Sequence, residues 1–192
     1  MAVHEMHRLF FALWPDEATR EALGRTASAL RSQHPESRGR WVRTDRYHVT
    51  LQFLGGRPDQ FPAALARSAA AVAASLPPAP AFDLRIDVAG SFRGRAAPWW
   101  LGSSRVPEPL RELWRRLRES LRAADLPHDE RDDFTPHVTV MRDAREPLPA
   151  SALGDAALDW PVSSFVLMHS RSGAQAPGYD VLETWPLRPA AG

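Results

Sequence analysis

Two short segments of this sequence repeat one four-residue pattern, and the repeat constrains the fold more than any other feature. Residues 48–51 read His-Val-Thr-Leu, and residues 137–140 read His-Val-Thr-Val. Each copy begins an apolar run with β-branched residues, which is typical of a β-strand. Because side chains alternate between the two faces of a strand, each copy should place a His and a Thr on one face and two aliphatic side chains on the other.

Chance does not account for this His-x-Thr pattern occurring twice. With 7 His and 7 Thr among 192 residues, a random order would produce about 0.26 such triplets. One copy alone would be explained by a strand whose outer face happens to be polar. Two copies, each with Val in the middle and an aliphatic residue at the end, favour a shared functional role.

Composition limits the classes of protein to which the chain can belong. A length of 192 residues fits one domain or two closely packed lobes, and 44% hydrophobic with 24% charged residues is ordinary for a soluble globular protein. The net charge of +1 provides no global positive field of the kind that a non-specific duplex-binding protein uses. All 24 basic residues are Arg and Cys is absent, which excludes lysine amines, thiolate nucleophiles, disulfides and Cys-ligated zinc.

The distribution of apolar residues favours a cytoplasmic protein without membrane contact. The apolar run near the N-terminus covers only residues 9–14, which is too short for the core of a signal peptide. No stretch of the sequence approaches the ~20 apolar residues that a membrane span needs. No obligatory protein partner is evident from the sequence.

Strand-like and helix-like patterns alternate along the chain. We expect helices at about residues 16–33, 59–76 and 107–125, and strands at residues 8–14, 48–54, 82–88, 99–101, 137–140, 162–169 and 179–187. Gly55 and Gly56 should end the strand of the first repeat, and residues 99–101 should pair with residues 82–88. Since the repeats occupy corresponding positions, the order suggests two strand-and-helix lobes related by a pseudo-twofold axis.

The third expected helix has the clearest periodicity. One apolar stripe consists of Leu110, Leu113, Trp114, Leu117 and Leu121. The opposite face carries Arg111, Arg115, Arg118 and Arg122 among glutamates. This face could bind RNA, but a solvated helix surface is the favoured interpretation.

The paired histidines are the strongest candidates for catalysis. Imidazole titrates near neutrality, so one His can be a general base while the other, protonated, is a general acid. In-line displacement at phosphorus uses both at once, since water must lose a proton and the departing oxygen must gain one. The hydroxyls of Thr50 and Thr139 would donate hydrogen bonds to the non-bridging phosphate oxygens.

Other chemistries remain open but fit the pattern less well. Two His two strands apart could bind zinc, but a zinc site normally needs a third protein ligand, and Thr is a poor one. A serine triad is weaker still, because neither repeat lies near a G-x-S-x-G pattern. The other histidines are interpreted as structural: His4 and His7 near a frayed terminus, His34 and His128 in polar loops, and His169 at a strand end, where it could also line a cleft.

Several further segments accompany the two repeats in a known family. They are residues 8–13, 41–42, 48–55, 90–92 and 134–140 with Arg142, then Ser170 and residues 179–187. With these surroundings the HxTx repeats are specific, and the sequence resembles the 2H phosphoesterase superfamily, most closely its RNA 2′,3′-cyclic phosphodiesterases, also described as 2′-5′ RNA ligases.

The resemblance implies an α+β fold with two pseudo-symmetric lobes, each an antiparallel sheet with flanking helices, around a central cleft, so that residues 1–192 form a single bilobal domain. It implies an RNA 2′,3′-cyclic 3′-phosphodiesterase, which hydrolyses cyclic phosphate ends of RNA, or small cyclic nucleotides, to 2′-phosphomonoesters without metal or cofactor. It assigns His48 as the proton donor to the leaving 3′ oxygen and His137 as the proton acceptor that activates water. Thr50 and Thr139 would then hold the phosphate.

The resemblance also points to residues beyond the repeats. In similar proteins the position five residues after each His, here Phe53 and Arg142, lies near the bound nucleotide. Strict alternation would direct both side chains to the face opposite the histidines, so a bulge or bend is needed. Met141 departs from the family pattern, which usually has a small residue there, and we expect it to narrow the cleft.

A function from a different class also stays open. The chain could be a nucleotide- or RNA-binding module that retains the cleft but has lost turnover. The presence of both histidines and both threonines argues against such decay.

Overall fold

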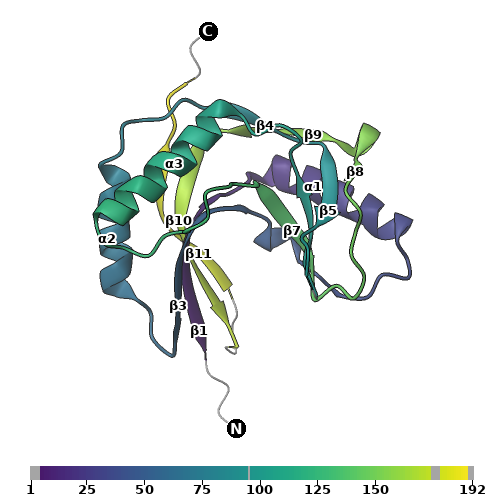
Figure 1. Cartoon of the computed structure of the whole chain (residues 1–192), viewed down its shortest axis with the longest axis horizontal. Helices are drawn as coiled ribbons and strands as arrows, with labels where there is room; N and C mark the ends of the chain where they lie inside the picture. The colour runs from purple at the N-terminus through teal and green to yellow at the C-terminus, as the bar shows by residue number, and fades with distance from the viewer. Residues whose placement is uncertain (1–4, 95, 174–177, 190–192) are drawn as a thin grey trace.

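The structure is a computed structural model that describes residues 5–94, 96–173 and 178–189. One helix lies on one side of the strands and the other two lie together on the opposite side (Figure 1). The helices in these ranges are α1 (Glu17–Gln33), α2 (Ala63–Ala74) and α3 (Glu108–Ala123). The strands are β1 (Met6–Leu13), β2 (Arg40–Trp41), β3 (Val49–Pro58), β4 (Phe82–Ile86), β5 (Val88–Ser91), β6 (Trp99–Gly102), β7 (His137–Arg142), β8 (Ser151–Ala152), β9 (Leu158–Val162), β10 (Ser164–Ser172) and β11 (Gly178–Pro186).

An antiparallel sheet of nine strands organises the fold. Its order is β11-β10-β1-β3-β7-β6-β5-β8, with β2 added beside β7, while β4 and β9 form a separate antiparallel pair. The strands of the two repeats are central neighbours, because β3 ends the group β11-β10-β1-β3 and β7 begins the group β7-β6-β5-β8. The predicted α+β class with antiparallel sheets is confirmed, and the two strand groups are hydrogen-bonded into one sheet through β3 and β7.

The helices do not stay with the strands that precede them in the sequence. Helix α1 follows β1 but packs against β9, and Thr26 of α1 donates a hydrogen bond to the carbonyl of Ala156 at 2.8 Å. Helices α2 and α3 pack against each other and lie beside β3 and β11 at the opposite side of the molecule (Figure 1). The chain therefore crosses between the two strand groups, which ties them together.

The boundaries of α1 and α3 follow the expected signals closely. Asp16 caps α1 by accepting a hydrogen bond from the Thr19 backbone at 2.8 Å. Helix α2 is shorter than expected and begins after Pro62. The predicted stripe of α3 is buried throughout, and its charged face forms ion pairs such as that between Arg115 and Glu119 at 2.7 Å, in keeping with a solvated surface.

Three strand predictions were wrong for identifiable reasons. Strand β3 continues through Gly55 and Gly56 because both pair with β1, and Gly55 has φ 108°, which glycine adopts without a Cβ clash. Residues 82–88 divide at Asp87, so β4 pairs with β9, while β6 pairs with β5 and β7. Strand β9 escaped detection because Pro161 interrupts its pattern. A proline is tolerated there because β9 is an edge strand of the two-stranded β4–β9 sheet.

The N-terminal strand is buried on both faces from Leu9 to Leu13. Leu9, Phe11 and Leu13 join the main core, while Phe10 and Ala12 face the other way into a small cluster with Val166 and Met168. His7 lies within β1 and not in a frayed terminus, whereas His4 lies outside the described residues. No helix in the described ranges is long and apolar enough to cross a membrane.

Candidate active site

The two repeats meet where β3 lies beside β7. Val49 and Val138 are direct antiparallel partners, and neither is exposed to solvent. Continuing this register by one residue in each direction places His48 opposite Thr139 and Thr50 opposite His137. Residues opposite one another in a sheet share a face, and neighbours of a buried residue point to the other face. The four polar side chains therefore form one set, the His–Thr cluster, around a local twofold axis.

Both imidazoles are held by the same kind of hydrogen bond. The Nδ1 atom of His48 lies 2.7 Å from the carbonyl oxygen of Arg46, and that of His137 lies 2.8 Å from the carbonyl oxygen of Thr135. Because a carbonyl oxygen only accepts, Nδ1 must carry the hydrogen in each ring. In the neutral form, the Nε2 atom of each ring consequently has a free lone pair, and in the protonated form it is a donor.

The surroundings favour the neutral form of both histidines. Burial lowers the pKa of His48 to about 4, with smaller contributions of the same sign from Arg142 and His137, against the hydrogen bond to Arg46. Burial also lowers the pKa of His137 from its usual 6.5, and the positive charge of Arg131 adds to this effect. In the unliganded protein both rings are thus mainly neutral at pH 7.

Aromatic side chains explain why His48 is desolvated. Its ring centroid lies 5.0 Å from Phe10, 5.6 Å from Tyr179 and 6.3 Å from Trp14. On the other side of the cluster, the rings of Phe92 and His137 are nearly perpendicular, with centroids 4.7 Å apart. Sequence reasoning did not assign these aromatic residues to the site, although Phe10 shares its strand face with Ala12 and opposes Phe53 across the β1–β3 pair.

A pocket of about 560 Å³ opens beside His48 and Thr50, and its lining is strongly basic. Six of its lining residues are arginines, and none of the described residues that line it is Asp or Glu: the arginines are Arg8, Arg40, Arg43, Arg46, Arg142 and Arg171. Some of them also pair with carboxylates set back from the pocket, as Arg40 does with Asp143 at 3.0 Å. Such a lining suits an anionic ligand. His137 and Thr139 do not line this pocket and lie beside it through the β3–β7 register.

Phe53 and Arg142 both reach this pocket because each strand contains a bulge. Ala12 pairs with Thr50 while Phe11 pairs with Gln52, which leaves Leu51 as an extra residue in β3. In the same way, Trp100 pairs with Thr139 and Trp99 with Met141, which leaves Val140 extra in β7. An extra residue reverses the alternation of faces beyond it. The bulge that the family resemblance required is therefore present at the last residue of each repeat, and the side chains of Phe53 and Arg142 line the pocket.

Met141 does not narrow the pocket, contrary to expectation. Because the bulge precedes it, Met141 falls on the buried face of β7 and has no exposed surface. Its side chain packs beneath Gly39, where a Cβ atom would lie 2.6 Å from the Met141 sulfur. Met141, which stands where the family usually has a small residue, is thus accommodated because the neighbouring residue 39 is a glycine.

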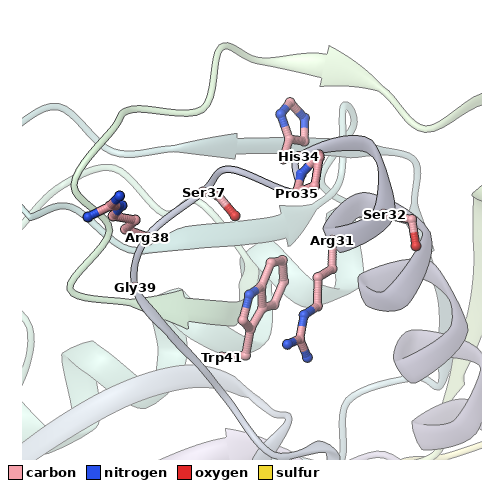
Figure 2. A pocket seen from close by; sticks show the side chains of 8 residues that line it. All are labelled: Arg31, Ser32, His34, Pro35, Ser37, Arg38, Gly39 and Trp41. Atoms are coloured by element: carbon pink, nitrogen blue, oxygen red, sulfur yellow. The ribbon is translucent and has the colours of Figure 1, made fainter.

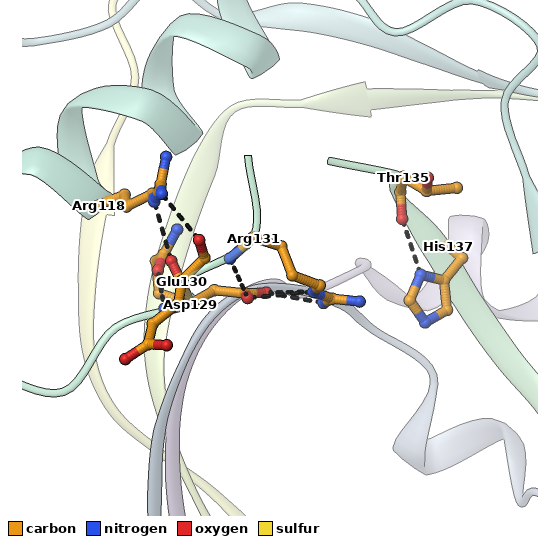
Figure 3. A network of polar contacts seen from close by, with 7 residues as sticks. Arg118, Asp129, Glu130, Arg131, Thr135 and His137 are labelled. Atoms are coloured by element: carbon orange, nitrogen blue, oxygen red, sulfur yellow. Dashed lines mark hydrogen bonds and ion pairs between the residues drawn. The ribbon is translucent and has the colours of Figure 1, made fainter. Parts of the chain in front are cut away.

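A loop residue that the sequence did not single out, Arg131, faces His137 (Figure 3). The Arg131 guanidinium donates to the Asp129 carboxylate at 2.7 Å, and the backbone N–H of Asp129 donates to Gln52 at 2.9 Å. Arg118 of α3 further fixes this loop by donating to the Asp129 carbonyl at 2.9 Å. In the sequence this segment has the pattern of an acidic loop. In the structure the Asp129 carboxylate orients the Arg131 guanidinium toward His137.

His169 does not line the pocket, although its neighbour Ser170 does. The His169 residue is 7% exposed and its Nε2 atom lies 2.9 Å from Nδ1 of His7, with the two rings nearly coplanar and their centroids 5.1 Å apart. Across the described ranges, no group of three or more His, Asp or Glu side chains is arranged to hold a metal ion.

Comparison with known proteins identifies the family of this chain. A family model described as the 2′-5′ RNA ligase superfamily matches residues 15–174. The RNA 2′,3′-cyclic phosphodiesterase of Escherichia coli (strain K12) is 31% identical over 186 residues, covering 95% of this chain and 98% of the relative. A protein of the same name from Thermus thermophilus is 31% identical over 192 residues, with coverage of 94% and 90%.

Solved structures extend the match to three dimensions. The crystal structure of E. coli LigT in its apo form superposes with a TM-score of 0.72 at 31% identity, covering 96% of this chain and 99% of that one. LigT complexed with 3′-AMP superposes with a TM-score of 0.70 at 30% identity, with coverage of 95% and 98%. The chain therefore belongs to the 2′-5′ RNA ligase superfamily and is a homologue of the RNA 2′,3′-cyclic phosphodiesterases over nearly its full length.

Proposed function

We propose that this protein is an RNA 2′,3′-cyclic 3′-phosphodiesterase, a hydrolase that opens a 2′,3′-cyclic phosphate to a 2′-phosphomonoester by acid–base catalysis without a metal ion. The observation that carries this proposal is the Val49–Val138 pair, whose register brings two His and two Thr to one face around a local twofold axis. The two strand groups are then the lobes of a single domain, and the face bearing the His–Thr cluster is the floor of the cleft between them. Relatives that carry this name and LigT complexes with 3′-AMP and phosphate support it.

The twofold arrangement matches the two proton transfers of an in-line displacement. The Nε2 atom of His137 accepts a proton from water as the water oxygen bonds to phosphorus. The bond from phosphorus to the 3′ oxygen breaks, and protonated His48 donates the Nε2 proton to that oxygen. The products are a 3′-hydroxyl and a 2′-phosphate, with His48 neutral and His137 protonated. Thr50 and Thr139 donate hydrogen bonds to the non-bridging oxygens, where negative charge is stabilised.

The low pKa of His48 sets a condition on this mechanism. A ring with a pKa of about 4 is neutral at pH 7 and cannot donate a proton from Nε2. A phosphodiester anion bound against the ring favours the charged form and raises its pKa. Substrate binding is therefore coupled to proton uptake by His48, and Phe53 and Arg142 help to provide the binding free energy, the first by stacking on a base and the second by its charge.

Turnover assays test the proposed function directly. RNA with a 2′,3′-cyclic end and 2′,3′-cyclic mononucleotides should yield 2′-phosphates in the presence of chelator. His48→Ala and His137→Ala should each lower kcat/KM by at least ~10²-fold, the usual contribution of one positioned proton-transfer group. A substrate with a better leaving group should restore part of the activity of His48→Ala but not of His137→Ala.

Two results would overturn the proposal in different directions. Activity that chelator abolishes and zinc restores would indicate a metallohydrolase. Tight binding of cyclic phosphates without any turnover would indicate that the chain is a nucleotide- or RNA-binding module that uses the same cleft.

A further inference from the structure

A second pocket adjoins the first, because Trp41 lines both. Figure 2 shows the side chains that line the second pocket. The second pocket has a volume of about 620 Å³ and lies between the end of α1 and the segment that leads into β2. Its lining includes Arg31, Ser37 and Arg38 together with Trp41, and none of the described residues that line it is acidic. Eight of the 24 arginines of the chain line one of these two pockets.

The second pocket combines an aromatic ring with unpaired cations. The guanidinium carbon of Arg31 lies 5.7 Å from the centre of the Trp41 ring, and Figure 2 shows the two side chains close together. Arg31 and Arg38 are exposed, and within the described part of the chain neither guanidinium forms an ion pair. Aromatic rings and arginines together are the means by which proteins hold single-stranded nucleic acid, since bases stack on the rings and phosphates bind the cations.

Strand β2, which carries the Trp41 shared by the two pockets, is held at a fixed position relative to the His–Thr cluster. Arg40 and Trp41 of β2 pair with Arg142 and Met141 at the end of β7, the strand that begins with His137. The carbonyl of Arg38 accepts a hydrogen bond from the Arg145 backbone at 2.9 Å. The Trp41 ring also meets Trp99 edge to face, with centroids 6.1 Å apart. A ligand seated on Trp41 is thus held at a constant position from the reacting phosphate.

We propose that the second pocket binds the nucleotide on the 5′ side of the cyclic end, so that the protein acts on RNA in preference to a cyclic mononucleotide. This inference rests on the proposed function and names its substrate. A terminal nucleotide whose cyclic phosphate lies at the His–Thr cluster fills the first pocket, and its chain continues only through its 5′-phosphate. The next base then stacks on the Trp41–Arg31 pair, and the connecting phosphate lies near Arg38. A mononucleotide has no group that reaches this pocket.

The test compares substrates of different length that share the same cyclic end. In the wild-type protein, a trinucleotide with a 2′,3′-cyclic end should have a kcat/KM at least about fivefold above that of the matching cyclic mononucleotide, the lower limit for one stacked base. Arg31→Ala and Arg38→Ala should each reduce this advantage and leave mononucleotide hydrolysis unchanged. Arg25→Ala is the matched control, because Arg25 is an exposed arginine on the same helix that lines neither pocket.

Salt dependence gives an independent measurement. On a single strand, each phosphate contact contributes about 0.7 to the magnitude of the slope of log affinity against log salt, so Arg38→Ala should lower that magnitude for the trinucleotide by about 0.7. Equal kcat/KM for both substrate lengths, or equal losses on both substrates in the Arg31 and Arg38 variants, would overturn the second site while the proposed function stands. Hydrolysis of neither substrate by the wild-type protein would overturn both.

Discussion

Val49 and Val138 face each other across β3 and β7, and the pair joins the two strand groups of the sheet. Both side chains are fully buried, so they hold the strands from the core side while the neighbouring His and Thr residues point to the other face. Hydrophobic packing therefore determines the spacing of the catalytic candidates. The substitutions considered below separate the residues that contact substrate from those that act through the histidines or through the packing beneath them.

Replacing Arg142 should weaken substrate binding without damaging the fold. Its side chain is exposed, lines the pocket beside His48, and is brought there by the bulge at Val140. We expect Arg142→Ala to raise KM for a cyclic phosphate by about tenfold, as for loss of a hydrogen bond to a charged group. Arg57→Ala is the control, because Arg57 is an exposed arginine on β3 outside the pocket. Unchanged kcat and KM in Arg142→Ala would remove this residue from the site.

Arg142 also shows how far the sequence could predict the site. The alternation within each repeat predicted the strands and the shared face of His48 and Thr50, because a period of two is a local property. The location of a bulge depends on which residues of neighbouring strands pair, as with Leu51 opposite β1, and no local pattern encodes that pairing. The family resemblance required a bulge or bend in each strand, but only the register between paired strands in the structure shows at which residue each bulge lies.

Arg131 illustrates a second limit of local patterns. Its orientation depends on Asp129, which is anchored by Gln52 from a strand 77 positions earlier in the sequence. Four acidic residues and one Arg in a loop indicate a solvated segment when they are read alone. The contact with the His137 environment arises only when α3 and β3 bring the loop over the cluster.

Removing the charge of Arg131 should change the pH dependence of kcat/KM, which we expect to be bell-shaped. Arg131 lowers the pKa of His137, so Arg131→Ala should raise it. At pH values below the pKa of both histidines, kcat/KM follows the fraction of neutral His137, and the variant should lose activity there. Above both values, kcat/KM follows the fraction of protonated His48, and the loss should be small.

The matched variant for this experiment is Arg131→Lys, which keeps the positive charge and should retain the wild-type profile on the acid side. NMR titration of the His137 ring gives a direct check, since its pKa should move upward in Arg131→Ala alone. A uniform loss at every pH would show that Arg131 acts by another route, such as direct contact with the substrate.

The packing between Gly39 and Met141 predicts a coupled pair of substitutions. A Cβ at residue 39 would lie 2.6 Å from the Met141 sulfur and 2.9 Å from the Arg142 carbonyl oxygen. Gly39→Ala should therefore lower the free energy of unfolding by about 1–3 kcal/mol, as overpacking does. Met141→Ala should also destabilise the protein, because it removes a buried side chain.

The double variant Gly39→Ala/Met141→Ala should be more stable than the sum of the single effects predicts, by about 1 kcal/mol, since the smaller side chain makes room for the new methyl group. Urea denaturation of the four proteins measures this coupling. Additive free energies would mean that Gly39 is required by the backbone alone and not by Met141.

The lowered pKa of His48 should make the folded state less stable in acid. An unfolded chain binds a proton at this residue below pH 6.5, whereas the folded protein does so only near pH 4. As the pH falls through this window, the unfolded state gains protons that the folded state does not, so the free energy of unfolding decreases, by up to about 3 kcal/mol. His48→Gln removes the titrating group and should reduce this loss.

The free energy of unfolding of His48→Gln, measured relative to that of the wild type, should therefore increase as the pH falls from 6.5 to 4. Above pH 8 this difference should be constant. If the free energies of unfolding of the wild type and of His48→Gln differed by the same amount at every pH between 6.5 and 4, the environment of His48 would not suppress its protonation. Substrate binding would then not need to be coupled to proton uptake by His48.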